Sequence, residues 1–270
     1  MKVGFIGVGN MGGALASAAA KAVGGDSLLL TDLSAELLVK KATMLGATAT
    51  DAATLVAQSD YIFLGVKPQV LERVLTDLRP ALAQRAVPPV FVSMAAGVPM
   101  ESVRRWVGGT EGYCPIIRIM PNTPVAVGAG MVLYALSAEV TEGQKADFCR
   151  ILSAAGKLSE MPEKLMDAGT AVSGCGPAFA ALFIEALADG GVECGLPRGQ
   201  ALELAVQTVL GTARQLQATE SHPAALKDAV CSPGGSTIAG VHALEAGGFR
   251  SLAMDAVTAA YERTQELAKG

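Results

Sequence analysis

The chain has 270 residues, of which 51% are hydrophobic, 17% are charged and 4% are aromatic. This composition excludes intrinsic disorder and gives fewer charges than the ~25% of a typical soluble protein. The formal net charge is −4, and the 21 basic residues are scattered singly or in pairs. A nucleic-acid partner is therefore not expected, because binding a phosphate backbone needs a basic patch.

Neither the cysteines nor the histidines form a metal-binding pattern. The five cysteines are widely spaced without a CxxC pair, so we expect reduced core thiols of a cytoplasmic protein. His222 and His242 lack metal-ligand spacing, and no metal is expected. Uncharged stretches over 3–20, 119–138 and 168–184 are broken by Gly, Pro or Asn. We expect none of them to span a membrane.

The first 160 residues alternate short apolar runs with helical patterns. Strands are predicted at Val3–Ile6, Ser27–Thr31, Tyr61–Leu64, Val90–Val92 and Ile116–Ile119. Helical patterns follow the first two runs, to about Val23 and from a Ser34 cap to about Leu45. This alternation predicts right-handed βαβ units and a parallel, doubly wound sheet.

Beyond about Pro162 the strand-like runs give way to helical periodicity. Apolar residues between Leu202 and Leu216 recur at three- and four-residue steps, and 251–267 is also helix-like. The segment Ala178–Ala188 is apolar on nearly all sides. Such a helix is normally buried all round, which is easiest if a second subunit covers it. We predict an α/β domain over 1–160 and an all-helical domain over 161–270.

A GxGxxG motif over 7–12 follows the first strand and opens a helix, the context typical of a Rossmann-type dinucleotide-binding turn. Gly7 permits the tight turn, Gly9 lets a pyrophosphate approach the backbone, and Gly12 brings the helix close to the strand. The helix N-terminus offers free N–H groups to the phosphates. The alternative is a glycine-rich turn without a ligand.

The end of the second strand bears on the choice of coenzyme. Asp32 lies twenty positions after Gly12, where an acidic residue accepts hydrogen bonds from ribose hydroxyls and favours NAD over NADP. Thr31 and Ser34 offer hydroxyls that could bind a 2′-phosphate, but no Arg follows closely. These residues leave both nicotinamide coenzymes open.

Two more loops, Val66–Pro68 and Ala95–Gly97, follow predicted strands. The carboxyl ends of strands are where open α/β sheets bind ligands, and small residues there let a dinucleotide lie against backbone. The alternative is that Gly and Pro only end these strands.

A second constellation lies in the helical half, where the sequence CSPGGST over 231–237 precedes a helical stretch. A Gly-Gly turn and two hydroxyls at a helix N-terminus form a site for an anion such as a carboxylate. Ser236 or Thr237 could equally be a plain N-cap. The stretch 172–190 has no Lys, His or Asn, so it lacks the acid that ketone reduction needs. An imine that enters already protonated fits better.

With these motifs, the sequence resembles the pyrroline-5-carboxylate reductase family over nearly its whole length. The matching segments are Phe5–Gly12, Val66–Pro68, Ala95–Val98, Met120–Pro124, Val172–Ala178, Leu226–Asp228, Cys231–Ile238 and Gly247–Arg250. The resemblance implies reduction of L-1-pyrroline-5-carboxylate to L-proline in proline biosynthesis, with hydride from NADPH or NADH. It implies NADP(H) as coenzyme, while Asp32 keeps NAD(H) open.

The resemblance also implies roles for individual residues. Thr237 would orient the ring and Glu220 would lie near the substrate, so these two are the catalytic candidates; a solvated helix-end carboxylate is the alternative for Glu220. Substrate binding is expected at Ser232, Gly234, Gly235, Ser236 and Thr237. Coenzyme binding is expected at Gly7, Gly9, Asn10, Met11, Gly12, Asp32, Ser34, Val66, Lys67, Pro68, Ala95, Ala96, Gly97 and Asn122. The helical domains would pair into a homodimer or a larger oligomer such as a decamer.

One departure and two alternatives remain. The Ser-Gly-Ser-Gly-Pro-Ala-Tyr typical of the family reads SGCGPAF over 173–179, which removes two hydroxyls. A hydroxy-acid dehydrogenase with the same two-domain plan is disfavoured by the lysine-free stretch 172–190. A dinucleotide sensor without turnover is disfavoured by the anion loop over 232–237, since a sensor needs no second ligand site.

Overall fold

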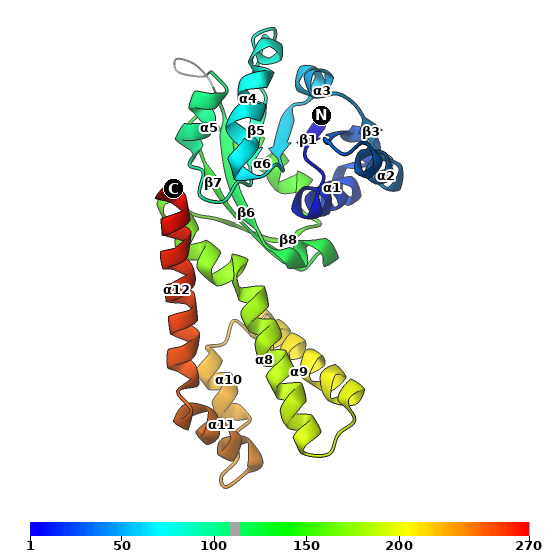
Figure 1. Cartoon of the computed structure of the whole chain (residues 1–270). Coiled ribbons are helices and arrows are strands. Elements are labelled where there is room, and N and C mark those ends of the chain that lie inside the picture. Colours follow the sequence, from blue (N-terminus) through cyan, green and yellow to red (C-terminus); the bar gives the residue numbers. More distant parts are fainter. Residues whose placement is uncertain (109–113, 270) are drawn as a thin grey trace. The chain divides into compact units, whose positions relative to one another are not determined.

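The computed structural model describes residues 1–108 and 114–269, which form two compact units (Figure 1). The first unit comprises residues 1–174 together with the end of the chain from Tyr261. The second unit comprises residues 175–260.

The first unit is built on one eight-stranded sheet with the order β3-β2-β1-β4-β5-β6-β7-β8. The strands are β1 (Val3–Ile6), β2 (Leu28–Thr31), β3 (Thr48–Ala49), β4 (Tyr61–Leu64), β5 (Val90–Ser93), β6 (Ile116–Pro121), β7 (Gly130–Leu136) and β8 (Gly156–Glu160). The order reverses direction between β1 and β4, which is the switch point where doubly wound sheets bind ligands. The predicted Rossmann-type sheet is confirmed.

Helices cover both faces of this sheet (Figure 1). Those on one face are α1 (Asn10–Val23), α2 (Ala35–Leu45) and α6 (Glu142–Ile151). Those on the other are α3 (Ala52–Gln58), α4 (Pro68–Leu82) and α5 (Met100–Trp106). Because side chains alternate along a strand, Phe5 packs on the first face, its ring stacked on Phe63 at 4.5 Å, while Ile6 packs on the second.

The five predicted strands pair in parallel as expected, but β7, which was not predicted, runs antiparallel to β6. Only residues 122–129 join them, with a 3₁₀ turn over Thr123–Val127 and a left-handed Gly128 at φ 73°. A connection this short cannot hold a crossover helix, so the chain must return antiparallel. Parallel pairing resumes at β8, after α6.

Helices follow the last strand. The first unit has short turns over Glu163–Leu165, Met166–Gly169 and Thr170–Gly174, the last of them π-helical. The second unit holds α8 (Gly176–Glu193), α9 (Arg198–Thr219), α10 (Pro223–Ala229) and α11 (Ser236–Ala246). The last helix, α12 (Phe249–Lys269), begins in the second unit and ends in the first. The predicted helical segments lie within α8, α9 and α12.

The second unit exposes many large apolar side chains. Helix α8 packs on α9 through Ala188, Ala201 and Ala205, but Ala188 is its only buried residue and Leu182 is 67% exposed. The expected all-round burial of 178–188 is therefore not achieved by one chain.

The helical run Glu163–Glu193 is long and apolar enough to cross a membrane, judged by length and composition alone.

The five cysteines are free. Cys114 is buried, and this burial raises the pKa of its thiol to about 11. The prediction of core thiols is right for Cys114 and wrong for Cys194, which is exposed.

Candidate functional site

Three glycines at the switch point allow backbone segments to touch. Gly7 has φ 90°, in the left-handed region that favours glycine. A Cβ atom on Gly12 would lie 2.1 Å from the Gly7 carbonyl oxygen, and one on Gly65 would lie 2.4 Å from the same oxygen. The loop after β1 therefore contacts both the start of α1 and the loop after β4. A side chain at Gly12 or Gly65 would clash with its backbone.

Gly9 differs from these three glycines, because the packing of the protein does not require it. A Cβ atom there would meet no atom within 4 Å, and its φ of −62° suits any residue. Gly9 is also the N-cap of α1, where no side chain accepts a hydrogen bond from the first turn. The open space and the free N–H groups fit a pyrophosphate lying against the backbone. Beside it, Asn10 is exposed and Met11 is half-buried.

Two further predicted loops lie on this edge of the sheet, since β1, β4 and β5 are parallel neighbours. Lys67 is the N-cap of α4 and Pro68 its first residue, again without a side-chain cap. Gly97 turns the chain after β5 with φ 73°. The Ala95 side chain is buried in the core, so only its backbone is available to a ligand. Val66 is half-buried and Ala96 is exposed.

Asp32 is held beside the glycine loop by two hydrogen bonds. The Val8 N–H donates to Oδ2 at 2.8 Å and the Ser34 N–H donates to Oδ1 at 3.0 Å. The Ser34 hydroxyl accepts from the Leu37 N–H at 3.3 Å, so it caps α2 as predicted. The end of β2 and the glycine loop thus form one hydrogen-bonded unit.

Asn122 lies just after β6, and its amide group is engaged within the protein. Its Oδ1 accepts from the Met131 N–H at 2.8 Å, and its Nδ2 donates to the Ser173 carbonyl at 2.9 Å. These bonds tie the π-helical turn to the strands β6 and β7. Contact between Asn122 and a coenzyme stays a prediction.

In the second unit, the predicted anion loop leads into α11. Gly234 has φ 67°, and the Gly235 N–H donates to the Ser232 carbonyl at 3.0 Å, which closes a turn. Gly235, and neither hydroxyl residue, is the N-cap, and no side chain caps the helix. The plain N-cap interpretation of Ser236 and Thr237 is therefore wrong. The first-turn N–H groups form a site suited to an anion.

Glu220 ends α9 in a left-handed conformation, with φ 51°. Among the residues that the structure describes, it is the only non-glycine residue with positive φ, a conformation that costs about 1–2 kcal/mol. Such strain is often found at functional sites. Its side chain is exposed, so both interpretations of this carboxylate stay open.

Arg118 is a buried charge that the sequence analysis missed. It is 5% exposed and contacts Glu163 Oε1 and Asp167 Oδ1, each at 3.3 Å. Glu163 Oε1 also accepts from the Met100 N–H at 2.8 Å. A lone arginine within the apolar run 116–119 was the available signal. Its role is to fasten the segment after β8 to the sheet.

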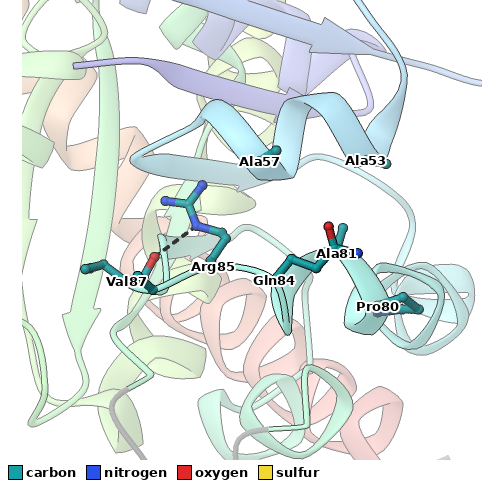
Figure 2. Close-up of a pocket in the computed structure, with 8 residues that line it drawn as sticks. Ala53, Ala57, Pro80, Ala81, Gln84, Arg85 and Val87 are labelled. Carbon is teal, nitrogen blue, oxygen red and sulfur yellow. Dashed lines mark hydrogen bonds between the residues drawn. The ribbon is translucent and has the colours of Figure 1, made fainter.

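A hollow of about 600 Å³ lies near the amino-terminal ends of β4 and β5, opposite to the carboxyl ends that carry the predicted coenzyme loops (Figure 2). Its lining residues are Ala53, Ala57, Pro80, Ala81, Gln84, Arg85, Ala86 and Val87. The Arg85 guanidinium donates hydrogen bonds to the carbonyls of Val56 and Val87.

Within the described part of the chain, no group of three His, Cys, Asp or Glu side chains is placed to hold a metal ion.

Comparisons with known proteins agree with this arrangement. Residues 163–267 match the family model for pyrroline-5-carboxylate reductase dimerisation, and residues 2–97 match that for coenzyme F420-dependent NADP oxidoreductases. A pyrroline-5-carboxylate reductase of Synechocystis is 54% identical, over 78% of this chain and 76% of the relative. Human pyrroline-5-carboxylate reductase 2 is 41% identical, over 99% of this chain and 84% of the relative.

A solved structure extends the similarity to the fold. The crystal structure of Plasmodium falciparum pyrroline carboxylate reductase with NADP bound superposes with a TM-score of 0.85. It is 32% identical, and the match covers 99% of this chain and 98% of that one. From its glycine loop to its uncapped helix α11, this chain belongs to the pyrroline-5-carboxylate reductase family.

Proposed function

We propose that the chain reduces L-1-pyrroline-5-carboxylate to L-proline, the last step of proline biosynthesis. The coenzyme supplies a hydride from C4 of its dihydronicotinamide ring. The imine enters protonated on nitrogen, the carbon of its C=N bond (C2 of the pyrroline ring, which becomes C5 of proline) accepts the hydride, and the π electrons of the C=N bond become the nitrogen lone pair. The net reaction consumes the imine, NAD(P)H and one proton, and it yields proline and NAD(P)⁺.

The uncapped N-terminus of α11 is the observation that carries this proposal. A carboxylate is the one permanent charge on the substrate, and the exposed turn over Gly234–Thr237 presents backbone N–H groups at the positive end of a helix. Ser232 closes the turn through its carbonyl. The same end has no acidic residue in its first turn to repel an anion.

Thr237 and Glu220 are the residues proposed to act on the ring. The Thr237 hydroxyl sits on the first turn of α11, next to the carboxylate site, where it can orient the imine nitrogen. Glu220, held in a strained conformation, supplies a negative charge that stabilises the iminium ion. Thr237 would thus orient the ring for hydride transfer, and Glu220 would stabilise its positive charge. Neither role requires a strong acid.

The coenzyme is proposed to bind in the first unit. The pyrophosphate lies against Gly9 and the first turn of α1, where a Cβ atom would find only open space. The other contacts carried over from the family are Gly7, Asn10, Met11, Gly12, Asp32, Ser34, Val66, Lys67, Pro68, Ala95, Ala96, Gly97 and Asn122. NADP(H) is the coenzyme named for the relative from Plasmodium falciparum.

The helical part, residues 161–270, is proposed to pair with a second copy. The match to a dimerisation model over 163–267 and the exposed Leu182 and Leu187 support a homo-oligomer. A ring of dimers such as a decamer, located in the cytoplasm, is the finer proposal. No nucleic-acid or membrane partner is proposed.

The test compares Thr237→Ala with Thr208→Ala, whose hydroxyl is occupied within α9 by the Leu204 carbonyl. The wild type should oxidise NADH or NADPH only when pyrroline-5-carboxylate is present and should form one proline per coenzyme. Thr237→Ala should lose about 10²-fold in kcat/KM while its coenzyme Kd is unchanged. Thr208→Ala should behave as wild type. Full turnover in Thr237→Ala would remove Thr237 from the mechanism.

A further inference from the structure

We propose that Asp32 makes this enzyme select NADH over NADPH. The inference rests on the proposed function for its kinetic readout, while coenzyme binding tests it separately. It concerns the segment from Thr31, the last residue of β2, to Glu36, in the first turn of α2.

The Asp32 carboxylate is fixed in position by the protein itself. Its two oxygens accept the Val8 and Ser34 N–H groups at 2.8 and 3.0 Å. The bond to Val8 ties it to the loop that faces the pyrophosphate, so the adjoining ribose places its hydroxyls beside this carboxylate. A carboxylate offers about four lone-pair sites, and two remain to accept the 2′- and 3′-hydroxyls of NADH.

NADPH carries a phosphate in place of the 2′-hydroxyl, and its charge would stand against Asp32. The segment adds a second negative charge at Glu36, in the first turn of α2. The first cation along α2 is Lys40, six residues beyond Ser34 and so about 9 Å further along the helix. The Lys41 ammonium lies against the first turn of α1, 3.1 Å from where a Cβ atom of Gly13 would be, so its charge stands beside the glycine loop that faces the pyrophosphate.

Neither of two neighbouring side chains offsets the charge of a 2′-phosphate. The Ser34 hydroxyl oxygen caps α2 by accepting from the Leu37 N–H, and its O–H remains a neutral donor that supplies no positive charge. Leu33 is fully exposed and presents an apolar chain where an arginine would pair with a phosphate. The fold itself accommodates the phosphate, because the relative from Plasmodium falciparum has NADP bound. Selection therefore lies in these few residues.

The experiment measures Kd for NADH and NADPH by fluorescence titration, and kcat/KM for each with pyrroline-5-carboxylate. Wild type should favour NADH at least about tenfold in both measurements, given like charges at close range. Asp32→Asn keeps the size and an acceptor oxygen but removes the charge, and it should shrink the preference about tenfold, chiefly through tighter NADPH binding. Asp77→Asn is the matched control, with the same substitution on an exposed side chain of α4 outside this segment, and should shift the preference less than about twofold.

A second variant keeps the test decisive if Asp32→Asn folds poorly. Leu33 is fully exposed, so Leu33→Arg should leave the fold intact while adding a guanidinium. It should tighten NADPH binding about tenfold and leave NADH binding nearly unchanged. Equal binding of the two coenzymes by wild type, or tighter NADPH binding, would overturn the inference. NADH-selective binding without any oxidation by pyrroline-5-carboxylate would contradict the proposed function and leave the inference standing.

Discussion

Glycine serves two different purposes within six residues of the loop after β1. Gly12 is required by packing, since a Cβ atom would lie 2.1 Å from a backbone oxygen that cannot move without distorting the turn. Gly9 is not required by packing, because the same atom would enter open space. Gly12 therefore maintains the fold, and Gly9 leaves the open space in which the pyrophosphate is proposed to lie.

This difference predicts opposite results for two alanine variants. Gly12→Ala should lower the free energy of unfolding by about 1–3 kcal/mol, as overpacking does. Gly9→Ala should keep the wild-type Tm and raise the Kd for NADH about tenfold, because its methyl group takes up space meant for the pyrophosphate. Thermal unfolding and fluorescence titration measure the two effects. Unchanged NADH affinity in a folded Gly9→Ala protein would show that the pyrophosphate lies elsewhere.

Other residues show the limit of sequence reasoning at this scale. The motif predicted Asp32 as a ribose acceptor, but the sequence could not reveal its hydrogen bond to Val8, 24 positions away. Asn122 was predicted to bind coenzyme, and the structure shows its amide bonded to Met131 and Ser173. Sequence patterns identify residues by type and spacing, whereas their hydrogen bonds depend on contacts between distant segments.

At the scale of elements, regular periodicity made prediction succeed. The five predicted strands each match a strand of the sheet, and Ser34 caps α2 as its sequence context indicates. The strands β3, β7 and β8 were missed for physical reasons, and β3 is only two residues long. β7 lies inside a long uncharged stretch whose Gly and Pro residues conceal its ends, and β8 (GKLSE) is polar and partly exposed at the sheet edge.

Helix α8 exposes an apolar surface that a single chain does not cover. Its sequence is apolar on nearly every side, yet only Ala188 is buried. A free surface of this kind is unfavourable in water at about 25 cal/mol per Å² of apolar area. A second copy of the helical part would cover it.

Leu182→Glu should therefore weaken the homo-oligomer, because it places a charge on an apolar face of α8. We expect sedimentation velocity to show a shift toward monomer at micromolar concentration. Val87→Glu is the control, since Val87 is 65% exposed against 67% for Leu182 but lies in the sheet-containing unit. An unchanged oligomer in Leu182→Glu, or equal dissociation in both variants, would exclude this face as the interface.

At the scale of the whole molecule, the two proposed ligand sites lie in different units. The residues proposed to bind the coenzyme all belong to the first unit, whereas Glu220 and the turn over 232–237, proposed to bind the substrate, belong to the second. The order of the motifs along the sequence led to the predictions of a coenzyme site, a substrate site and the reduction of an imine. The lone Arg118 in an apolar run signalled a buried charge, but its partners Glu163 and Asp167 in the connector after β8 could not be predicted, because they lie 45 and 49 positions away.

The measurement that tests the reaction most directly follows the hydride itself. The enzyme is incubated with pyrroline-5-carboxylate and NADH that carries deuterium at both C4 positions, and the proline formed is analysed by mass spectrometry and NMR. Hydride transfer from the coenzyme to the imine predicts proline that is one mass unit heavier, with the deuterium on C5 of proline. Proline without deuterium, or no proline from enzyme shown to bind NADH, would contradict hydride transfer to the imine.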